Sequence, residues 1–172
     1  MKNSLKATKM EILNTNECSA TLEAIISDAS KYVIIISPYI QLTPRIESLL
    51  EMAGNRDVPV FLVTRERLKK EEYNKVKGIK TLSVIIHPPL HAKVYFNEEE
   101  VLISSLNLYD FSQQNNTEIG VVFWRKYEKK EYQVLTKHFL DIMEDKRSDM
   151  PVAKLDDKQL KRFEKALNGS WF

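Results

Sequence analysis

Residues 91–107 read HAKVYFNEEEVLISSLN and combine two apolar, strand-forming runs with polar residues that a buried strand seldom carries. The runs are rich in Val, Ile, Leu and aromatic residues, and the acids between them indicate a turn, so we predict two short strands, near residues 90–96 and 100–104. The polar residues stand at the two ends of the stretch and are His91, Lys93, Ser105 and Asn107. The question is which chemistry these polar residues provide at this spacing.

Alternate residues of a strand point to the same face of a sheet. In the first strand, His91, Lys93 and Tyr95 are therefore predicted to project together on one face. Ala92, Val94 and Phe96 are predicted to point the other way, into a core. Ser105 and Asn107 share a face if they are extended. Side by side, the two segments gather an imidazole, an ammonium, a hydroxyl and an amide. Such donors stabilise the charge of a five-coordinate phosphorus, and a histidine attacks it or moves protons, which predicts phosphodiester cleavage.

The rest of the chain predicts alternating helices and strands. Four segments are predicted to be helical: 17–31, 44–53, 126–145 and the polar segment 65–77. Strand-length apolar runs occupy 32–38, 58–63, 81–87 and 118–123. This order implies helices on the faces of a mixed sheet, an α/β/α layered single domain. We assign residues 1–150 to this domain and residues 151–172 to a C-terminal helical tail docked on it.

Composition limits the class of protein. The chain has 172 residues, 43% hydrophobic and 29% charged, which suits one globular domain. No apolar run is long enough to cross a bilayer and no apolar signal region follows the first lysines, so we expect a cytoplasmic protein without membrane association. The single cysteine, Cys18, leaves no intrachain disulfide or cysteine–zinc cluster. Four glycines and no GxxxxGK or GxGxxG argue against a Gly-rich nucleotide cradle, and we expect no cofactor.

The formal charge is only +2, yet Lys and Arg gather in residues 65–80 and 125–130. These clusters either contact a polyphosphate backbone or form solvated helix faces. Four further residues have less specific signals. We expect His87 to be structural or to line a rim, with contact to substrate as the less favoured alternative. His138 has no acidic or cysteine cluster spaced for zinc, and Trp124 and Trp171 either pack or stack on bases.

The polar residues of 91–107, taken in order with a downstream acid, resemble the HKD motif of the phospholipase D superfamily. The motif positions are His91, Lys93, Glu98, Ser104, Ser105, Asn107 and Glu118. Three apolar runs, IIISPYI (34–40), VPVFLVT (58–64) and NTEIGVVF (116–123), resemble core strands of that family. The chain departs from the family pattern at two positions, with Glu98 in place of aspartate and Ser104 in place of glycine.

This resemblance implies a role for each residue. His91 attacks phosphorus, and Lys93, Ser105 and Asn107 hold the non-bridging oxygens. Glu118 accepts a hydrogen bond from the far ring nitrogen of His91. Glu98 and Ser104 support the site, and Tyr39 either walls the cleft or packs in the core. Because the chain carries one motif, it is similar to small bacterial nucleases that dimerise, which implies a homodimer with a shared, metal-independent site.

The motif does not name the substrate. We favour DNA or RNA, because residues 65–80 are basic and no amphipathic membrane anchor is evident. Two alternatives remain open. One is a nucleic-acid-binding module whose catalysis is impaired by the changes at Glu98 and Ser104, and the other is a lipid phosphodiesterase or phosphatidyltransferase.

Overall fold

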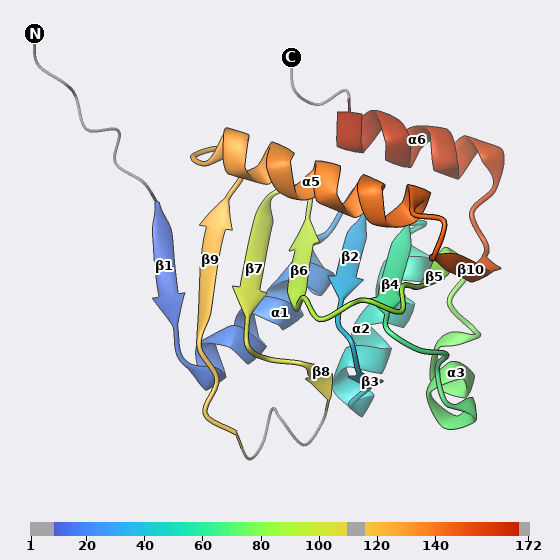
Figure 1. Cartoon of the computed structure of the whole chain (residues 1–172), viewed down its shortest axis with the longest axis horizontal. Helices are drawn as coiled ribbons and strands as arrows, with labels where there is room; N and C mark the ends of the chain where they lie inside the picture. Colours follow the sequence, from blue (N-terminus) through green and yellow to red (C-terminus); the bar gives the residue numbers. More distant parts are fainter. Residues whose placement is uncertain (1–8, 110–115, 169–172) are drawn as a thin grey trace, which may run out of the picture.

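The computed structural model describes residues 9–109 and 116–168, and its centre is a mixed sheet of eight strands (Figure 1). In chain order these strands are β1 (Met10–Leu13), β2 (Val33–Ile36), β4 (Val60–Thr64), β5 (Leu82–Ile86), β6 (Val94–Asn97), β7 (Glu100–Ser104), β9 (Gly120–Trp124) and β10 (Asp149–Ala153). Across the sheet they follow the order β1-β9-β7-β6-β2-β4-β5-β10. Strands that are distant in sequence are thus neighbours in space.

The directions of the strands decide which loops meet. Strands β2, β4 and β5 run parallel, whereas β6, β7, β9 and β1 continue the sheet antiparallel. Ile36, the last residue of β2, lies opposite Val94, the first residue of β6, and Val94 lies opposite Ile103 near the end of β7. The end of the sheet where β2, β4 and β7 finish and β6 begins is called the carboxyl edge below.

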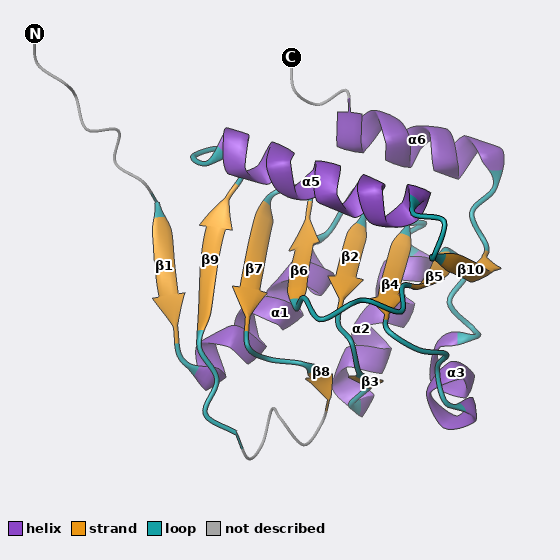
Figure 2. Ribbon diagram, viewed as in Figure 1, coloured by secondary structure: helices purple, strands orange, loops and turns teal. Residues whose placement is uncertain are grey.

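Helices cover both faces of this sheet (Figure 2). The helices of one face are α1 (Thr15–Asp28) and α2 (Pro44–Asn55), those of the other are α5 (Lys129–Glu144) and α6 (Asp157–Asn168), and α3 (Lys70–Val76) follows β4. Side chains of β2 alternate between two cores, since Val33 and Ile35 pack on the α1 side and Ile34 and Ile36 on the α5 side. Burial on both faces accounts for the unbroken apolar run of β2. The predicted α/β/α layered mixed sheet is confirmed.

Local signals fix the helix ends and the position of the last helix. Asn14 and Glu17 form a reciprocal capping box at the start of α1, and Thr43 caps α2 just before Pro44. The ring of Phe163 on α6 is buried, and its centroid lies 4.3 Å from that of Phe61. Because Phe163 also meets other aromatic rings of this core, α6 packs firmly on the sheet through α5 and β4.

Four strands were not predicted, and two boundaries differ most from the sequence-based expectation. The missed strands are short or exposed and depend on their partners for stability: β1, β10, β3 (Ile40–Gln41) and β8 (Leu108–Tyr109). The helix predicted at 65–77 is limited to Lys70–Val76, and the strand predicted at 90–96 begins only at Val94. His91 and Lys93 therefore lie in an irregular segment after the Pro88-Pro89 turn.

None of the helices in the described ranges is long and apolar enough to span a membrane.

Candidate active site

The polar motif residues meet at the carboxyl edge, where β6 begins and β7 ends. His91 and Lys93 lie immediately before β6, and Ser105 lies immediately after β7. The backbone N–H of Ser104 donates to the carbonyl of Lys93 at 3.2 Å, which extends the β6–β7 pairing by one step. Antiparallel pairing thus brings the His-Ala-Lys and Ser-Leu-Asn segments together, as the sequence predicted for two adjacent strands.

The segment that carries His91 is anchored although its side chain is exposed. Leu90 is buried, and its N–H donates to the carbonyl of His87 at 2.9 Å, closing the turn after β5. The His87 ring is itself buried, and its Nδ1 lies 2.9 Å from Ser148 Oγ, so His87 acts as a structural residue. Lys93 Nζ donates to the His91 carbonyl at 3.2 Å, which leaves two of its three N–H bonds for a ligand.

Glu118 and Ser105 form the second part of the site. Ser105 Oγ donates to Glu118 Oε2 and accepts from the N–H of Ile119 at 3.1 Å. The N–H of Glu118 donates to Thr15 Oγ1 at 2.8 Å, which ties the segment before β9 to the start of α1. Glu118 is buried, and within one chain its carboxylate accepts from Ser105. The hydrogen bond from His91 to Glu118 stays a prediction.

Asn107 is positioned by contacts that the sequence reasoning missed. The N–H of Leu108 donates to Ser37 Oγ at 3.0 Å, and this hydroxyl donates to the carbonyl of Tyr39 at 2.8 Å. The same two loops pair as the parallel strands β3 and β8. Asn107 Oδ1 is buried without a hydrogen-bond partner among the described residues. The serine directly after the apolar run of β2 was the available signal for this link.

Tyr39 is exposed and lines a cleft at the carboxyl edge of about 300 Å³. Arg67 and Lys69, from the basic segment that follows β4, line the same cleft. The cleft is also lined by Glu66, Glu71 and Glu72, so its lining is of mixed charge. This arrangement places part of the basic segment beside Tyr39 rather than on a distant helix face.

Two side chains of the first strand differ in burial from what alternation predicted. Tyr95 was expected to project with His91 and Lys93, but it is fully buried and donates through its hydroxyl to the carbonyl of Leu106 at 2.6 Å. Ala92 was expected to point into the core and is exposed. Both expectations were wrong because β6 begins only at Val94 and helices cover both faces of the sheet there. Tyr95 supports the Ser-Leu-Asn segment from beneath.

Glu98 and Ser104 have partners that are structural. Glu98 lies at the far end of β6 from His91, and its carboxylate accepts from the backbone N–H groups of Ser30 at 2.8 Å and Lys31 at 3.1 Å. It is buried and thereby fixes the loop between α1 and β2. Ser104 Oγ donates to the carbonyl of Ile119 at 3.0 Å and accepts from the N–H of Leu106 at 3.1 Å. The serine therefore fits without disturbing the end of β7.

Burial also keeps the nearest thiol unreactive. Cys18 packs beside Ser104 and Gly120, and burial raises the pKa of its thiol, with the Glu118 carboxylate adding to the increase against a lowering hydrogen bond from Ser104. A thiol with a raised pKa is a poor nucleophile at neutral pH. Among the residues that the structure describes, no three His, Cys, Asp or Glu side chains form a set that could hold a metal ion.

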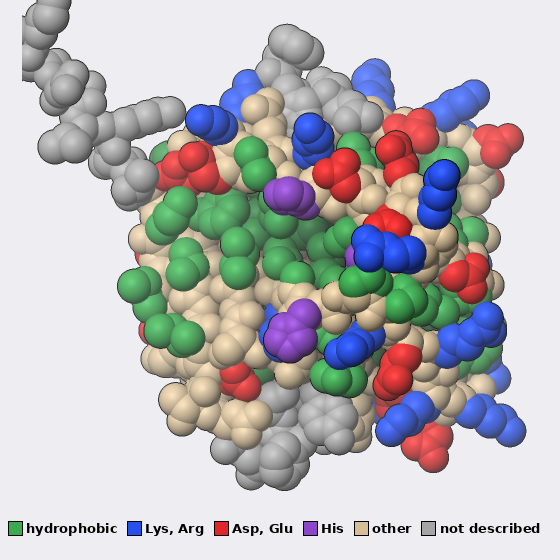
Figure 3. Space-filling model, in the orientation of Figure 1, with side chains coloured by type: hydrophobic (Ala, Val, Ile, Leu, Met, Phe, Trp, Pro, Cys, Tyr) green, Lys and Arg blue, Asp and Glu red, His purple; other side chains and the backbone are tan. Residues whose placement is uncertain are grey.

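An apolar surface adjoins the site on the face that carries α5. Ile12, Val121 and Ile103 stand opposite one another on β1, β9 and β7, and they share the face of Val94. Ile12 is 76% exposed, Ile103 45% and Ile119 63%. Figure 3 shows hydrophobic side chains gathered below α5 over β9, β7 and β6. We call Ile12, Ile103, Ile119 and Val121 the apolar row.

A hollow of about 420 Å³ continues this surface between α5 and the carboxyl edge. Ala92, the residue between His91 and Lys93, lines it. Its apolar walls come from the sheet and from α5 and include Ile36, Val94, Leu135 and Phe139, and its polar rim includes His87, His138, Asp141 and Asp145. The reactive histidine candidate therefore stands at the border between polar donors and an apolar depression.

The layered mixed sheet, with a histidine and a lysine before β6 and Ser-Leu-Asn after β7, defines the class of phospholipase D-like proteins. Residues 22–143 match the family described as cardiolipin synthase, PLD-like domain, and the chain belongs to this family. No curated protein sequence matches the chain significantly.

Solved structures of this class are similar to the chain in fold. The phospholipase D family member Nuc from Salmonella typhimurium has a TM-score of 0.67 at 20% identity, covering 83% of this chain and 97% of its own. NucT from Helicobacter pylori has a TM-score of 0.68 at 14% identity, covering 79% and 96%. Phosphatidylserine synthase from Haemophilus influenzae Rd KW20 has a TM-score of 0.67 at 12% identity, covering 95% and 47%.

Proposed function

We propose that the chain is a phosphodiesterase that cleaves DNA or RNA through a phosphohistidine on His91, at a site shared by two copies. The observation that carries the proposal is the meeting of two segments at the carboxyl edge. His91 and Lys93 reach solvent from an anchored loop, which the Ser104–Lys93 backbone bond holds beside Ser105 and Asn107. A phosphodiester needs this combination of one nucleophile and several fixed hydrogen-bond donors.

The reaction proceeds in two displacements. In the first, a ring nitrogen of His91 in one subunit bonds to phosphorus, and the bond to the leaving oxygen breaks as His91 of the partner subunit protonates that oxygen. In the second, the imidazole of the partner subunit takes a proton from water, whose oxygen displaces His91 from phosphorus. Lys93 and Asn107 hold the non-bridging oxygens in both steps.

The apolar row supports the homodimer. One chain supplies a single His91, whereas the two displacements need a nucleophile and a separate acid. A second copy related by a twofold axis supplies the missing imidazole. The apolar row and the hollow adjoin His91 on the α5 face, and three of the four residues of the row are strongly exposed in the single chain. Contact between two such faces buries this surface and places the two sites near one axis.

The basic segment of residues 65–80 supports nucleic acid as the substrate. Two of its cations, Arg67 and Lys69, line the cleft with Tyr39 at the edge that carries His91, where they can contact a phosphate backbone beside three glutamates. No element that would recognise particular bases is evident among the described residues of this cleft. Cleavage is therefore expected to follow the backbone rather than the sequence, and to weaken steeply as salt rises.

Incubation of the purified protein with plasmid, single-stranded DNA and RNA in EDTA tests this function. Wild-type protein is expected to cut at least one of them, while His91→Asn and Lys93→Gln lose activity by roughly a hundredfold or more. Lys137→Gln, which removes an exposed lysine of α5, is the matched control and should cut as the wild type does. Cleavage that survives in His91→Asn, or that needs a divalent metal, contradicts the proposal.

A lipid substrate is the second candidate, because an apolar hollow borders His91. An acyl chain fits such walls, whereas the phosphate would occupy the same polar donors. Turnover of phosphatidylcholine vesicles, with no cleavage of nucleic acid, would favour this lipid enzyme. Tight binding of DNA or RNA without cutting would instead favour a binding module.

A further inference from the structure

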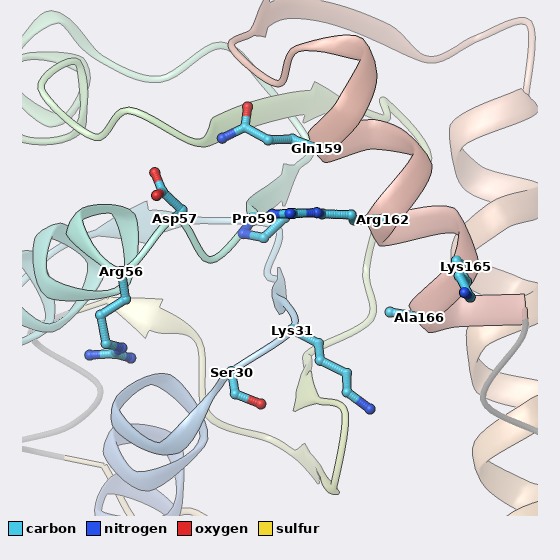
Figure 4. A pocket seen from close by; sticks show the side chains of 9 residues that line it. All are labelled: Ser30, Lys31, Arg56, Asp57, Pro59, Gln159, Arg162, Lys165 and Ala166. Carbon is cyan, nitrogen blue, oxygen red and sulfur yellow. The ribbon is translucent and has the colours of Figure 1, made fainter.

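A second basic pocket lies at the end of the sheet opposite the carboxyl edge (Figure 4). It has a volume of about 490 Å³ and lies where the α1–β2 loop, the α2–β4 turn and α6 meet. Its polar lining includes four cations and one carboxylate, contributed by Lys31, Arg56, Arg162, Lys165 and Asp57. Lys31 precedes β2, whereas Ser37 of the candidate active site follows it, so the length of β2 separates the two sites.

Most of this positive charge has no partner within the described part of the chain. Arg56 is the exception, because its Nη2 donates to the carbonyls of Ser27 at 3.0 Å and Ala29 at 3.3 Å, where α1 ends. Lys31, Arg162 and Lys165 make no ion pair and no side-chain hydrogen bond to the described residues. Cations that line one pocket repel one another. A bound anion offsets this electrostatic repulsion.

The walls of the pocket are fixed by contacts on the side away from it. The backbone N–H of Lys31 donates to the buried carboxylate of Glu98 at 3.1 Å. Asp57 has a φ of 58° and closes α2 through a bond from its N–H to the Gly54 carbonyl at 3.1 Å. Phe163, next to Arg162 on α6, is buried among aromatic rings. A pocket with rigid walls loses little entropy when a ligand binds.

The size of the pocket selects among anions. Its volume lies within the range of about 300–1,000 Å³ that is usual for sites of small organic ligands, and a lone inorganic phosphate is far smaller. Beyond the cations, the lining offers the Asp57 carboxylate and the Gln159 amide. Gln159 Oε1 accepts from the N–H of Asp156 at 3.0 Å, which leaves its amide N–H groups as donors.

We propose that this pocket binds a phosphate-bearing ligand of nucleotide size. Lys31, Arg162 and Lys165 hold the phosphates, and Asp57 and Gln159 meet hydroxyl and ring nitrogen groups of the ligand. A free nucleotide and the 5′-phosphorylated end of a nucleic acid both present this chemistry. The proposal does not depend on which substrate the His91 site cleaves, because the two sites lie at opposite ends of β2.

Isothermal titration at low salt tests the proposal with adenosine triphosphate, inorganic tripolyphosphate, and a short oligonucleotide with and without a 5′-phosphate. All titrations use the full chain carrying His91→Asn and Lys93→Gln, which removes the nucleophile of the first site and one of the cations that hold phosphate there. We expect adenosine triphosphate or the phosphorylated oligonucleotide to bind more tightly than tripolyphosphate. Arg162→Gln/Lys165→Gln should raise Kd by roughly tenfold or more, whereas Lys137→Gln should leave it unchanged.

The outcomes separate the sources of the ligand. Preference for adenosine triphosphate assigns the pocket to a free nucleotide, and preference for the 5′-phosphorylated oligonucleotide over its unphosphorylated form assigns it to a nucleic-acid end. Circular dichroism and thermal melting of the double variant should match the wild type, because Phe163 is retained. Lys31→Gln provides a second variant from a different element. The proposal is overturned if no probe binds, or if binding is the same in all variants.

Discussion

Glu98 occupies a position of the motif, but its hydrogen bonds hold the α1–β2 loop, at the far end of β6 from His91. Its carboxylate accepts from the N–H groups of Ser30 and Lys31 and from the Ser30 hydroxyl at 2.5 Å. Glu98→Ala leaves these donors without an acceptor, and we expect the free energy of unfolding to fall by roughly 2–4 kcal/mol, as urea denaturation measures.

Glu99→Ala provides the control for this prediction, since Glu99 is the exposed neighbour of Glu98. Its effect on stability should stay within about 0.5 kcal/mol. The activity of folded Glu98→Ala protein should remain near that of the wild type. Stability unchanged in Glu98→Ala, or activity lost from protein that is fully folded, would show that the carboxylate does something other than hold the α1–β2 loop.

The alternation of residues along a strand predicted the positions of some site residues and not of others. It placed Lys93 and Ser105 at one end of the sheet, because antiparallel pairing follows from the turn between two strands. It did not predict the burial of Tyr95, because helices cover both faces of the sheet where β6 begins, at the pairing of Val94 with Ile36. The partners of Glu98 lie 66 to 68 positions earlier in the chain, and no local pattern announces them.

At the scale of elements, the pairing of β3 with β8 controls the loop that carries Asn107. Each of these strands has only two residues, and the Ser37 hydroxyl joins their loops through Leu108 and Tyr39. So short a strand has no stability of its own and exists because the neighbouring loop pairs with it. This is why the apolar runs of β2, β4 and β7 could be predicted from sequence, whereas β3 and β8 could not.

Ser37→Ala tests the role of this link. The buried N–H of Leu108 loses its acceptor, so the unfolding free energy should fall by roughly 1–3 kcal/mol. The donor on Asn107 then moves, and kcat should fall by roughly ten- to a hundredfold with little change in KM. Ser27→Ala, a partly buried serine of α1, should leave kcat unchanged. A fall in stability alone, with kcat preserved, would contradict a positioning role.

At the scale of the molecule, the apolar row predicts how two copies meet. Ile103→Glu introduces a charge into the centre of the proposed contact, and burying it without a partner is unfavourable. We expect the variant to be a folded monomer, measured by gel filtration with light scattering against the 20.1 kDa chain mass, and to have lost nearly all cleavage. Dimerisation and cleavage should be lost together, because the proposed site needs two copies of His91.

Met52→Glu is the matched control for this prediction, because Met52 is an equally exposed apolar residue, at 50%, on α2 at the opposite face. It should remain a dimer and keep its activity. A dimeric Ile103→Glu protein, or an active monomer, would place the contact between copies elsewhere or remove the need for it.

The stability of the whole molecule at alkaline pH depends on its buried tyrosines. Burial is the main cause that raises the pKa values of Tyr32, Tyr95 and Tyr132 in the folded chain. A raised folded pKa contributes stability that is complete below the unfolded tyrosine pKa of about 10 and is lost as pH rises above it. Three such groups lower the unfolding free energy by about 4 kcal/mol per pH unit in that range, which approaches the whole stability of a domain. Three of the seven tyrosines should therefore ionise only together with the loss of circular dichroism. Ionisation of all seven at 295 nm in a chain with a native spectrum would contradict this coupling.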